Sequence, residues 1–333
     1  MITAKKAVQD IITNTAKKLI IADFTVPLVR LWDAYVDPRQ IERFWGPPGY
    51  PSTFARHDAA PGGQSHYWMT GPDGEKSGGY WEWTAVDAPH SFEVRDGFAT
   101  EDGTPNTDMP SMRMVFHFVE TALGSRVTTV THFASLEELE QLKSMGMEEG
   151  MRAAMAQIDD VVADLTSFAA GRYTELQRLG ETQARISRVV RGSADQVWRA
   201  HTEPELLSRW QLGPDGWSMP VCVVSTEVGA TLRSEWQNDE TGDRFGFTGE
   251  VVEATRPTRF VTTERMVSPG DPDGEQSPQT LNELTLTPVE SGTLVAYLIT
   301  YPDAEIREQI LATGMVDGME SGFARLEAEV LVG

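Results

Sequence analysis

Histidines are the side chains of this sequence best suited to moving protons near neutral pH. Two of the six, His66 and His132, lie in runs that alternate like β-strands, where an inward-facing imidazole can serve as a general acid or base. We assign no other catalytic candidate. His117 shares a strand face with Arg113, which predicts that this third histidine faces solvent.

Motifs of metal-dependent and nucleophilic enzymes are absent from the sequence. It contains no Gly-x-Ser-x-Gly elbow, HExxH run, P-loop or CxxC motif. No two histidines are four residues apart, and Cys222 is the single cysteine, so no zinc site is indicated. We therefore predict no metal and no cofactor, and we favour a binding protein over an enzyme.

Large apolar side chains form a more distinctive pattern. Met112, Met114, Phe116 and Phe118 alternate along one run and share one strand face, which we expect to point inward. Methionines at 147, 151 and 155 recur at helical spacing and should cover that face. Methionine and aromatic surfaces suit irregular apolar ligands, although any sheet that is covered by a helix needs such a core.

The residues that we predict to contact a ligand are aromatic or methionine side chains in both halves of the chain. They are Trp45, Trp68, Trp83, Phe92, Met114, Phe116, Phe118, Met147, Met151 and Met155, followed by Trp236, Phe247, Phe260, Met315, Met319 and Phe323. Trp45 and Tyr50 lie in a Pro/Gly loop suited to form a lip over a cavity. The first half carries more tryptophan and histidine, so we expect the binding site there.

The chain repeats itself. Matching residues recur 166 positions later, as Trp32, Ala34 and Pro38 do at Trp198, Ala200 and Pro204, and then 168 positions later, as Gly146, Met147 and Met151 do at Gly314, Met315 and Met319. Solenoid repeats have periods of about 20 to 50 residues, so this longer period indicates two duplicated domains.

Both repeats show the same order of elements. In the first, a β-rich run at 19–26 precedes a short helix at 28–36, six strands between 52 and 133, and a long helix at 136–170 that ends at Gly171. In the second, a strand at 185–190 and a helix at 195–201 precede further strands and a last helix at 304–331. This order predicts an α+β fold.

Several motifs carry a family resemblance. The runs at 32–38 and 44–50, the Pro61-Gly62-Gly63 turn and the run at 146–151 resemble the START/Bet v1-like (SRPBCC) superfamily, and more narrowly its branch named after the activator of the Hsp90 ATPase. The resemblance covers residues 18–170 and 182–332. It implies two tandem helix-grip domains, each a curved antiparallel sheet wrapped around a long C-terminal helix with two short helices, and an apolar cavity between sheet and helix.

The resemblance and the element order together predict the domain boundaries. We expect a helical N-terminal extension at residues 1–17, a first helix-grip domain at 18–171, a linker at 172–182 and a second domain at 183–333.

Charge and composition limit the partners. With 50 acidic against 28 basic residues the net charge is −22, which repels nucleic acid and anionic lipid. No run approaches the roughly 18 apolar residues that span a bilayer. The lone cysteine favours a reducing compartment, so we expect a cytoplasmic protein whose partner is a small hydrophobic molecule.

Three functions are compatible with the resemblance. The first is binding or sequestration of a hydrophobic or polycyclic molecule, of which enediyne antibiotic self-resistance is a specific version, although no cleavage-site glycine can be assigned. The second is a polyketide aromatase/cyclase-like enzyme, which needs inward-facing polar groups with perturbed pKa values. The third is an Hsp90-type co-chaperone, which needs a partner surface.

Overall fold

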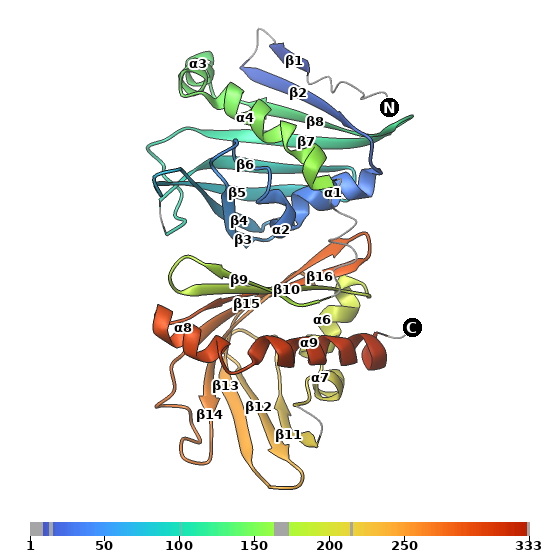
Figure 1. Ribbon diagram of the computed structural model, residues 1–333, viewed down its shortest axis with the longest axis vertical. Coiled ribbons are helices and arrows are strands. Elements are labelled where there is room, and N and C mark those ends of the chain that lie inside the picture. The colour runs from blue at the N-terminus through green and yellow to red at the C-terminus, as the bar shows by residue number, and fades with distance from the viewer. Residues whose placement is uncertain (1–8, 13–15, 101, 163–172, 214–215, 332–333) are drawn as a thin grey trace. The chain divides into compact units, whose positions relative to one another are not determined.

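The chain forms two compact units in the computed structural model, Met1–Ala170 and Gly171–Gly333 (Figure 1). The structure describes residues 9–12, 16–100, 102–162, 173–213 and 216–331. Each unit holds one eight-stranded antiparallel sheet with helices packed on one face. The predicted α+β class and the two tandem helix-grip domains are confirmed.

The first domain has strands in the spatial order β1-β2-β8-β7-β6-β5-β4-β3. They are β1 Gln9–Ile12, β2 Lys17–Phe24, β3 Ser52–His57, β4 Gln64–Thr70, β5 Lys76–Asp87, β6 Ser91–Ala99, β7 Ser111–Thr121 and β8 Gly124–His132. The helices are α1 Leu28–Val36, α2 Pro38–Ile41, α3 Leu136–Ser144 and α4 Met147–Ala156, and residues 158–162 are also helical. The Asp37 carboxylate accepts a hydrogen bond from the backbone N–H of Arg39, so α2 begins where Asp-Pro interrupts the first helix.

The second domain repeats this arrangement with strands in the order β11-β12-β13-β14-β15-β16-β10-β9. They are β9 Glu175–Leu179, β10 Gln183–Val190, β11 Trp217–Val223, β12 Thr231–Asn238, β13 Arg244–Thr255, β14 Arg259–Val267, β15 Thr280–Val289 and β16 Gly292–Thr300. The helices are α6 Ala194–Thr202, α7 Pro204–Trp210, α8 Ala304–Leu311, α9 Met315–Arg325 and the π-helix η1 Leu326–Val330. Ser193 and Gln196 form a capping box that starts α6.

The prediction of a helical N-terminal extension is wrong for the part of it that the structure describes. Gln9–Ile12 is an edge strand paired with β2, so that Ile11 lies opposite Leu19. The backbone hydrogen bonds of this segment are made with a neighbouring strand, and the local sequence pattern gives no sign of that neighbour. Residues 1–8 and 13–15 lie outside the described residues.

The expected linker at 172–182 contains a strand. Glu175–Leu179 pairs with β10 as β9, with Leu176 opposite Ile186, and Leu176 packs against the second core. The alternation of Leu176 with polar neighbours is the signal of this edge strand. Residue 172 lies outside the described residues.

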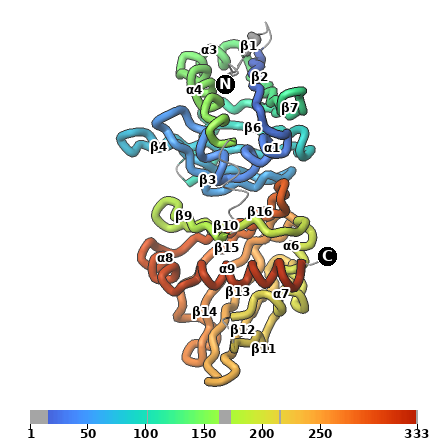
Figure 2. Tube along the Cα trace, turned by 45° about the vertical axis from the view of Figure 1, so that its right-hand side comes forward, coloured from blue at the N-terminus to red at the C-terminus, as the bar shows by residue number. Residues whose placement is uncertain are grey.

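The long covering helix of each domain is broken at a glycine, where the sequence predicted a continuous helix. Gly146 has φ +84° between α3 and α4, and Gly314 has φ +85° between α8 and α9. A side chain strains this left-handed conformation, which glycine adopts freely. Figure 2 shows α9 crossing the face of its sheet. The predicted continuation at 163–170 and the stop at Gly171 lie outside the described residues.

Membrane-spanning helices are not found among the described residues: none of their helices is long and apolar enough to cross a bilayer.

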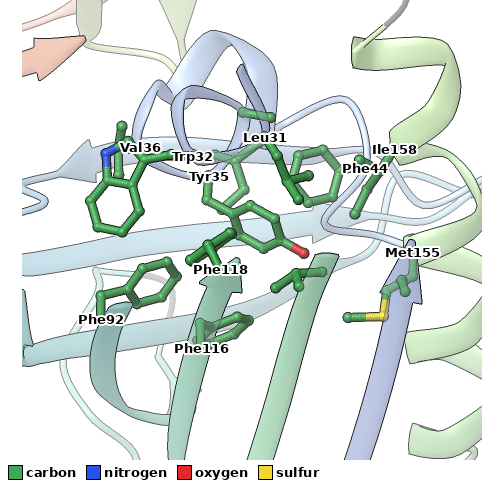
Figure 3. Close-up of a cluster of buried hydrophobic side chains, with 14 of the residues drawn as sticks. Leu31, Trp32, Tyr35, Val36, Phe44, Phe92, Phe116, Phe118, Met155 and Ile158 are labelled. Atoms are coloured by element: carbon green, nitrogen blue, oxygen red, sulfur yellow. The ribbon is translucent and has the colours of Figure 1, made fainter. Parts of the chain in front are cut away.

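The interior faces of the strands follow the predicted alternation. Met112, Met114, Phe116 and Phe118 of β7 are all buried, whereas His117 between them is exposed. Figure 3 shows two of these rings, Phe116 and Phe118, facing Tyr35 and Trp32 of α1. The prediction that this Met/Phe face points inward is confirmed.

Candidate functional site

The interior of the first domain is filled by aromatic rings. Trp81, Trp83, Phe92 and Phe116 are each at most 1% exposed. The rings of Phe92 and Phe116 stack with centroids 4.4 Å apart, and those of Trp83 and Phe92 lie 4.8 Å apart. Of the predicted ligand-contacting residues, Trp83, Phe92, Met114, Phe116, Phe118 and Met155 lie in this cluster. Their packing is that of a protein core.

A buried acid lies within that core. The Asp96 carboxylate accepts hydrogen bonds from Trp81 Nε1 at 2.8 Å and from the Tyr67 hydroxyl at 3.1 Å. Burial raises the pKa of Asp96 to about 7, although both hydrogen bonds favour its charged form. We did not predict this residue as part of a site. Its even spacing from Phe92 along β6 is the signal that could have placed it on the inner face.

A second polar group in the first core is a buried histidine network. Trp83 Nε1 donates to Ser65 Oγ at 2.8 Å, and that oxygen lies 2.9 Å from His57 Nδ1. His57 Nε2 lies 3.0 Å from the carbonyl oxygen of Tyr35. Since a carbonyl only accepts, Nε2 carries the imidazole proton and Ser65 donates to Nδ1. Each of these atoms therefore has a protein partner, as a structural network requires.

The two histidines predicted for catalysis lie on the outer face of the first sheet. His132 Nε2 is 3.2 Å from Arg113 Nη1. His66 lies beside Trp68, with ring centroids 5.8 Å apart, and Lys76 Nζ sits 5.1 Å above the Trp68 ring. Neither His66 nor His132 thus meets the condition of facing the interior, and Trp68 lies outside it too.

The remaining first-domain candidates lie near the ends of the core. The Trp45 ring is perpendicular to that of Trp81 at 4.6 Å and is half-buried. Met151 packs at the edge of the main aromatic cluster. Met147 belongs instead to a separate small cluster with Met112, under α3.

The inner face of the second domain is more open. Phe247, Glu264, Asn282 and Tyr297 point to the interior and are only half-buried. Their register is consistent with one shared face, because Leu284 lies opposite both Phe260 of β14 and Tyr297 of β16. Inward-pointing side chains that are only partly buried indicate an interior that is packed less completely than that of the first domain.

Two helices border this inner face. Met315 and Met319 of α9 are half-buried and pack against a small buried cluster that includes Ile299 and Tyr301. Phe323 at the end of α9 is buried and stacks on Trp210, with centroids 6.1 Å apart. The predicted second-domain contacts Phe260, Met319 and Phe323 come together here, while Trp236 and Phe247 lie at the β12–β13 end.

The second interior carries a cluster of polar groups. Burial raises the pKa of Glu264 to about 7, opposed by a hydrogen bond from Asn282. Burial, together with the Glu264 charge, raises the pKa of Tyr301 to about 12 and that of Tyr297 further. The Tyr301 hydroxyl and Asn282 Oδ1 are buried without a hydrogen-bond partner among the described residues.

A buried histidine borders the same interior. His201 Nδ1 lies 2.7 Å from the carbonyl oxygen of Val197, so it carries the proton, and burial lowers the pKa of His201 to about 4. Its ring lies 6.2 Å from that of Tyr297, and its Nε2 has no partner among the described residues. Neutral His201 therefore offers a hydrogen-bond acceptor.

The second interior thus combines half-buried apolar side chains with a few polar atoms that have no hydrogen-bond partner within the described part of the chain. Such a surface suits a mostly apolar molecule with one or two hydrogen-bonding groups. Across the described residues, no group of three or more His, Cys, Asp or Glu side chains is placed to hold a metal ion.

A sheet gripping a segmented C-terminal helix, present twice in one chain, defines a tandem helix-grip protein. The chain belongs to the family described as activator of Hsp90 ATPase homolog 1-like protein, whose family model matches residues 25–163 and 191–330. The resemblance read from the sequence motifs is confirmed at this level.

Solved structures similar to this chain each correspond to about one of its domains. Protein Ms6760 from Mycobacterium smegmatis is 51% identical over 44% of this chain and 91% of its own, with a TM-score of 0.42. A protein from Arthrobacter aurescens is 39% identical over 47% of this chain and 92% of its own, with a TM-score of 0.45. No curated protein matches the chain.

Proposed function

We propose that this protein binds and sequesters a small hydrophobic or polycyclic molecule between the sheet and the α8–α9 helices of its second domain. The observation that carries the proposal is the only half-buried inner face around Phe247, Glu264 and Tyr297. The equivalent face of the first domain is occupied by Trp81, Trp83 and other rings. The proposal places the ligand in the second domain, whereas the counts of tryptophan and histidine favoured the first.

Thermal denaturation and isothermal titration calorimetry of the full chain test this proposal. The ligand panel contains polycyclic aromatics, polyketides, fatty acids and an enediyne, the last for the self-resistance version of the function. At a ligand concentration of 100 times Kd, binding adds about 2.7 kcal/mol to the stability of the folded state. For a domain of this size that corresponds to a rise in Tm of roughly 5 to 11 °C.

Two matched variants locate the site. Met319→Trp fills the second interior, and Met151→Trp makes the same change at the equivalent position of the first domain. The proposal expects binding to be lost in Met319→Trp and kept in Met151→Trp. Loss in Met151→Trp alone would place the site in the first domain, and the absence of binding by every ligand class would refute sequestration.

One observation favours an enzyme as the second candidate. Glu264, with a pKa of about 7, is a half-buried acid in a mostly apolar interior, which suits a general acid or base. The reaction would be an aromatase/cyclase-like ring closure of a polyketide. Mass spectrometry of a poly-β-ketone substrate tests this function, with loss of turnover and retention of binding expected in Glu264→Gln.

A further inference from the structure

The two inward-pointing acids occupy equivalent places in the two repeats. Asp96 and Glu264 are 168 positions apart, the same offset as the matching glycines of the covering helices. Asp96 of β6 lies opposite Met112 of β7, and Glu264 of β14 lies opposite Thr280 of β15, also 168 positions later. The surroundings of the two acids can therefore be compared position by position.

In the first domain the chain itself supplies the hydrogen-bond donors for this acid. Trp81 Nε1 donates to Asp96 Oδ1 at 2.8 Å, and the Tyr67 hydroxyl donates to the same oxygen at 3.1 Å. Trp81 is fully buried, and Trp45 lies edge-on to it at 4.6 Å. Two aromatic rings with donor groups thus cover the carboxylate.

In the second domain neither donor is present. Gly249 stands where the first repeat has Trp81, and its neighbour Thr248 pairs with Arg265 next to Glu264. A Cβ at Gly249 would lie 1.8 Å from the Thr263 carbonyl oxygen, so the backbone itself requires glycine here. The indole that covers the acid of the first domain has no counterpart at this position.

The Tyr67 hydroxyl is also missing from the second domain. Tyr67 lies opposite Gly79, whereas Ser234 lies opposite Phe247. Phe247 restores a ring to this pair of positions, but that ring has no donor group. Glu264 therefore lacks both of the aromatic donors that Asp96 has.

Aromatic rings line the region beside Gly249, the position at which the first repeat has Trp81. Trp236 and Phe245 stack with centroids 5.3 Å apart, and Phe247 lies perpendicular to Trp236 at 5.8 Å. Close to Glu264, the buried Tyr301 hydroxyl and Asn282 Oδ1 lack partners among the described residues. Burying a polar atom without a hydrogen bond is costly, so these two atoms point to a ligand with polar groups.

We infer that the second-domain site takes a planar aromatic molecule that carries an O–H or N–H group, and that Glu264 accepts the hydrogen bond from this group. Asn282 already donates one hydrogen bond to Glu264, and the ligand would add an aromatic donor of the kind that Trp81 and Tyr67 supply to Asp96. This inference rests on the proposed function and names the ligand class of the same site.

Isothermal titration calorimetry of the full chain with two probes tests the inference. 2-Naphthol has a planar ring system and one O–H donor, and 2-methoxynaphthalene has the same rings without the donor. We expect 2-naphthol to bind about tenfold more tightly, the effect of one hydrogen bond in a buried site. Glu264→Met replaces the carboxyl group by an apolar side chain of similar length and should abolish this preference. Glu250→Gln, an exposed control on β13, should leave the preference unchanged.

A second variant tests the inference independently, in case Glu264→Met does not fold. Ser234→Tyr restores a phenol at the position equivalent to Tyr67, and we expect it to weaken 2-naphthol binding at least tenfold. Equal affinity for the two probes, or a preference that persists in Glu264→Met, would overturn the inference and leave sequestration intact. Binding of fatty acids without binding of either naphthalene would likewise overturn the inference and leave sequestration intact. If no ligand of the panel binds, both the inference and the proposed function are refuted.

Discussion

Replacing Asp96 with asparagine should make the stability of the first domain less dependent on pH. Asp96 is 8% exposed, and burial raises its pKa to about 7 from an ordinary value of 3.8. The folded state therefore holds this proton over a pH range in which the unfolded state has lost it. A raised carboxyl pKa contributes stability at low pH that is lost as pH rises toward the folded-state pKa.

The magnitude follows from the size of the pKa shift. Well between the two pKa values each pH unit costs about 1.4 kcal/mol, and this slope halves as pH reaches the folded-state pKa, so wild type should lose about 2 kcal/mol between pH 5 and pH 7 through Asp96. Asp96→Asn retains an acceptor oxygen for Trp81 Nε1 and has no titrating proton. Between pH 5 and pH 7 the difference in unfolding free energy between variant and wild type should therefore move by about 2 kcal/mol in favour of the variant.

Urea unfolding at pH 5, 6, 7 and 8, followed by tryptophan fluorescence, measures this difference. General charge repulsion from the acidic surface affects both proteins and cancels in the comparison. Asp87→Asn, an exposed change on β5, serves as the matched control and should leave the pH dependence of wild type unchanged. Parallel curves for wild type and Asp96→Asn across this range would refute the argument that burial holds the proton on Asp96.

Four further substitutions test the packing. Gly146→Ala and Gly314→Ala should each lower the unfolding free energy by about 1 kcal/mol, because both glycines have φ near +85°; an unchanged urea midpoint would contradict this. Ser65→Ala should lower the unfolding free energy by about 2 kcal/mol, because it removes a hydrogen-bond partner of both Trp83 Nε1 and His57 Nδ1. Ser111→Ala, at an exposed position, is its control and should stay within about 0.5 kcal/mol of wild type. Phe116→Leu introduces the leucine that stands at the equivalent position 284. It should lower the unfolding free energy measured in urea by about 1 to 2 kcal/mol. An unchanged unfolding free energy would show that the first core is loosely packed.

The sequence predicts the fold well because its signals are local and occur twice. Alternation along β7 assigned Met114 and Phe116 to the interior, and the structure buries both. The matching glycines at 146 and 314 marked equivalent positions, although their φ angles break helices that apolar periodicity alone predicted as continuous. The N-terminal strand was missed because its stability comes from pairing with β2.

The candidate site was harder to predict because it depends on which strand face points inward. Alternation along a strand shows which side chains share a face but not which face points inward, so Trp68 was predicted as a ligand contact although it lies on the outer face beside His66. The two inward acids, Asp96 and Glu264, were overlooked because acidic residues are rarely buried. Aligning them by the repeat offset identifies them as a pair, which a search within one domain does not reveal.

The indole of Trp81 can be regarded as a ligand attached to its own receptor. Its covalent tether gives it an effective concentration that a free molecule does not match, so external aromatics compete poorly for Asp96. The chain should accordingly saturate at one equivalent of ligand although it contains two copies of the same fold. On the proposed function, one copy of the duplicated fold holds its own indole against the acid, and the other is the copy that takes up ligand.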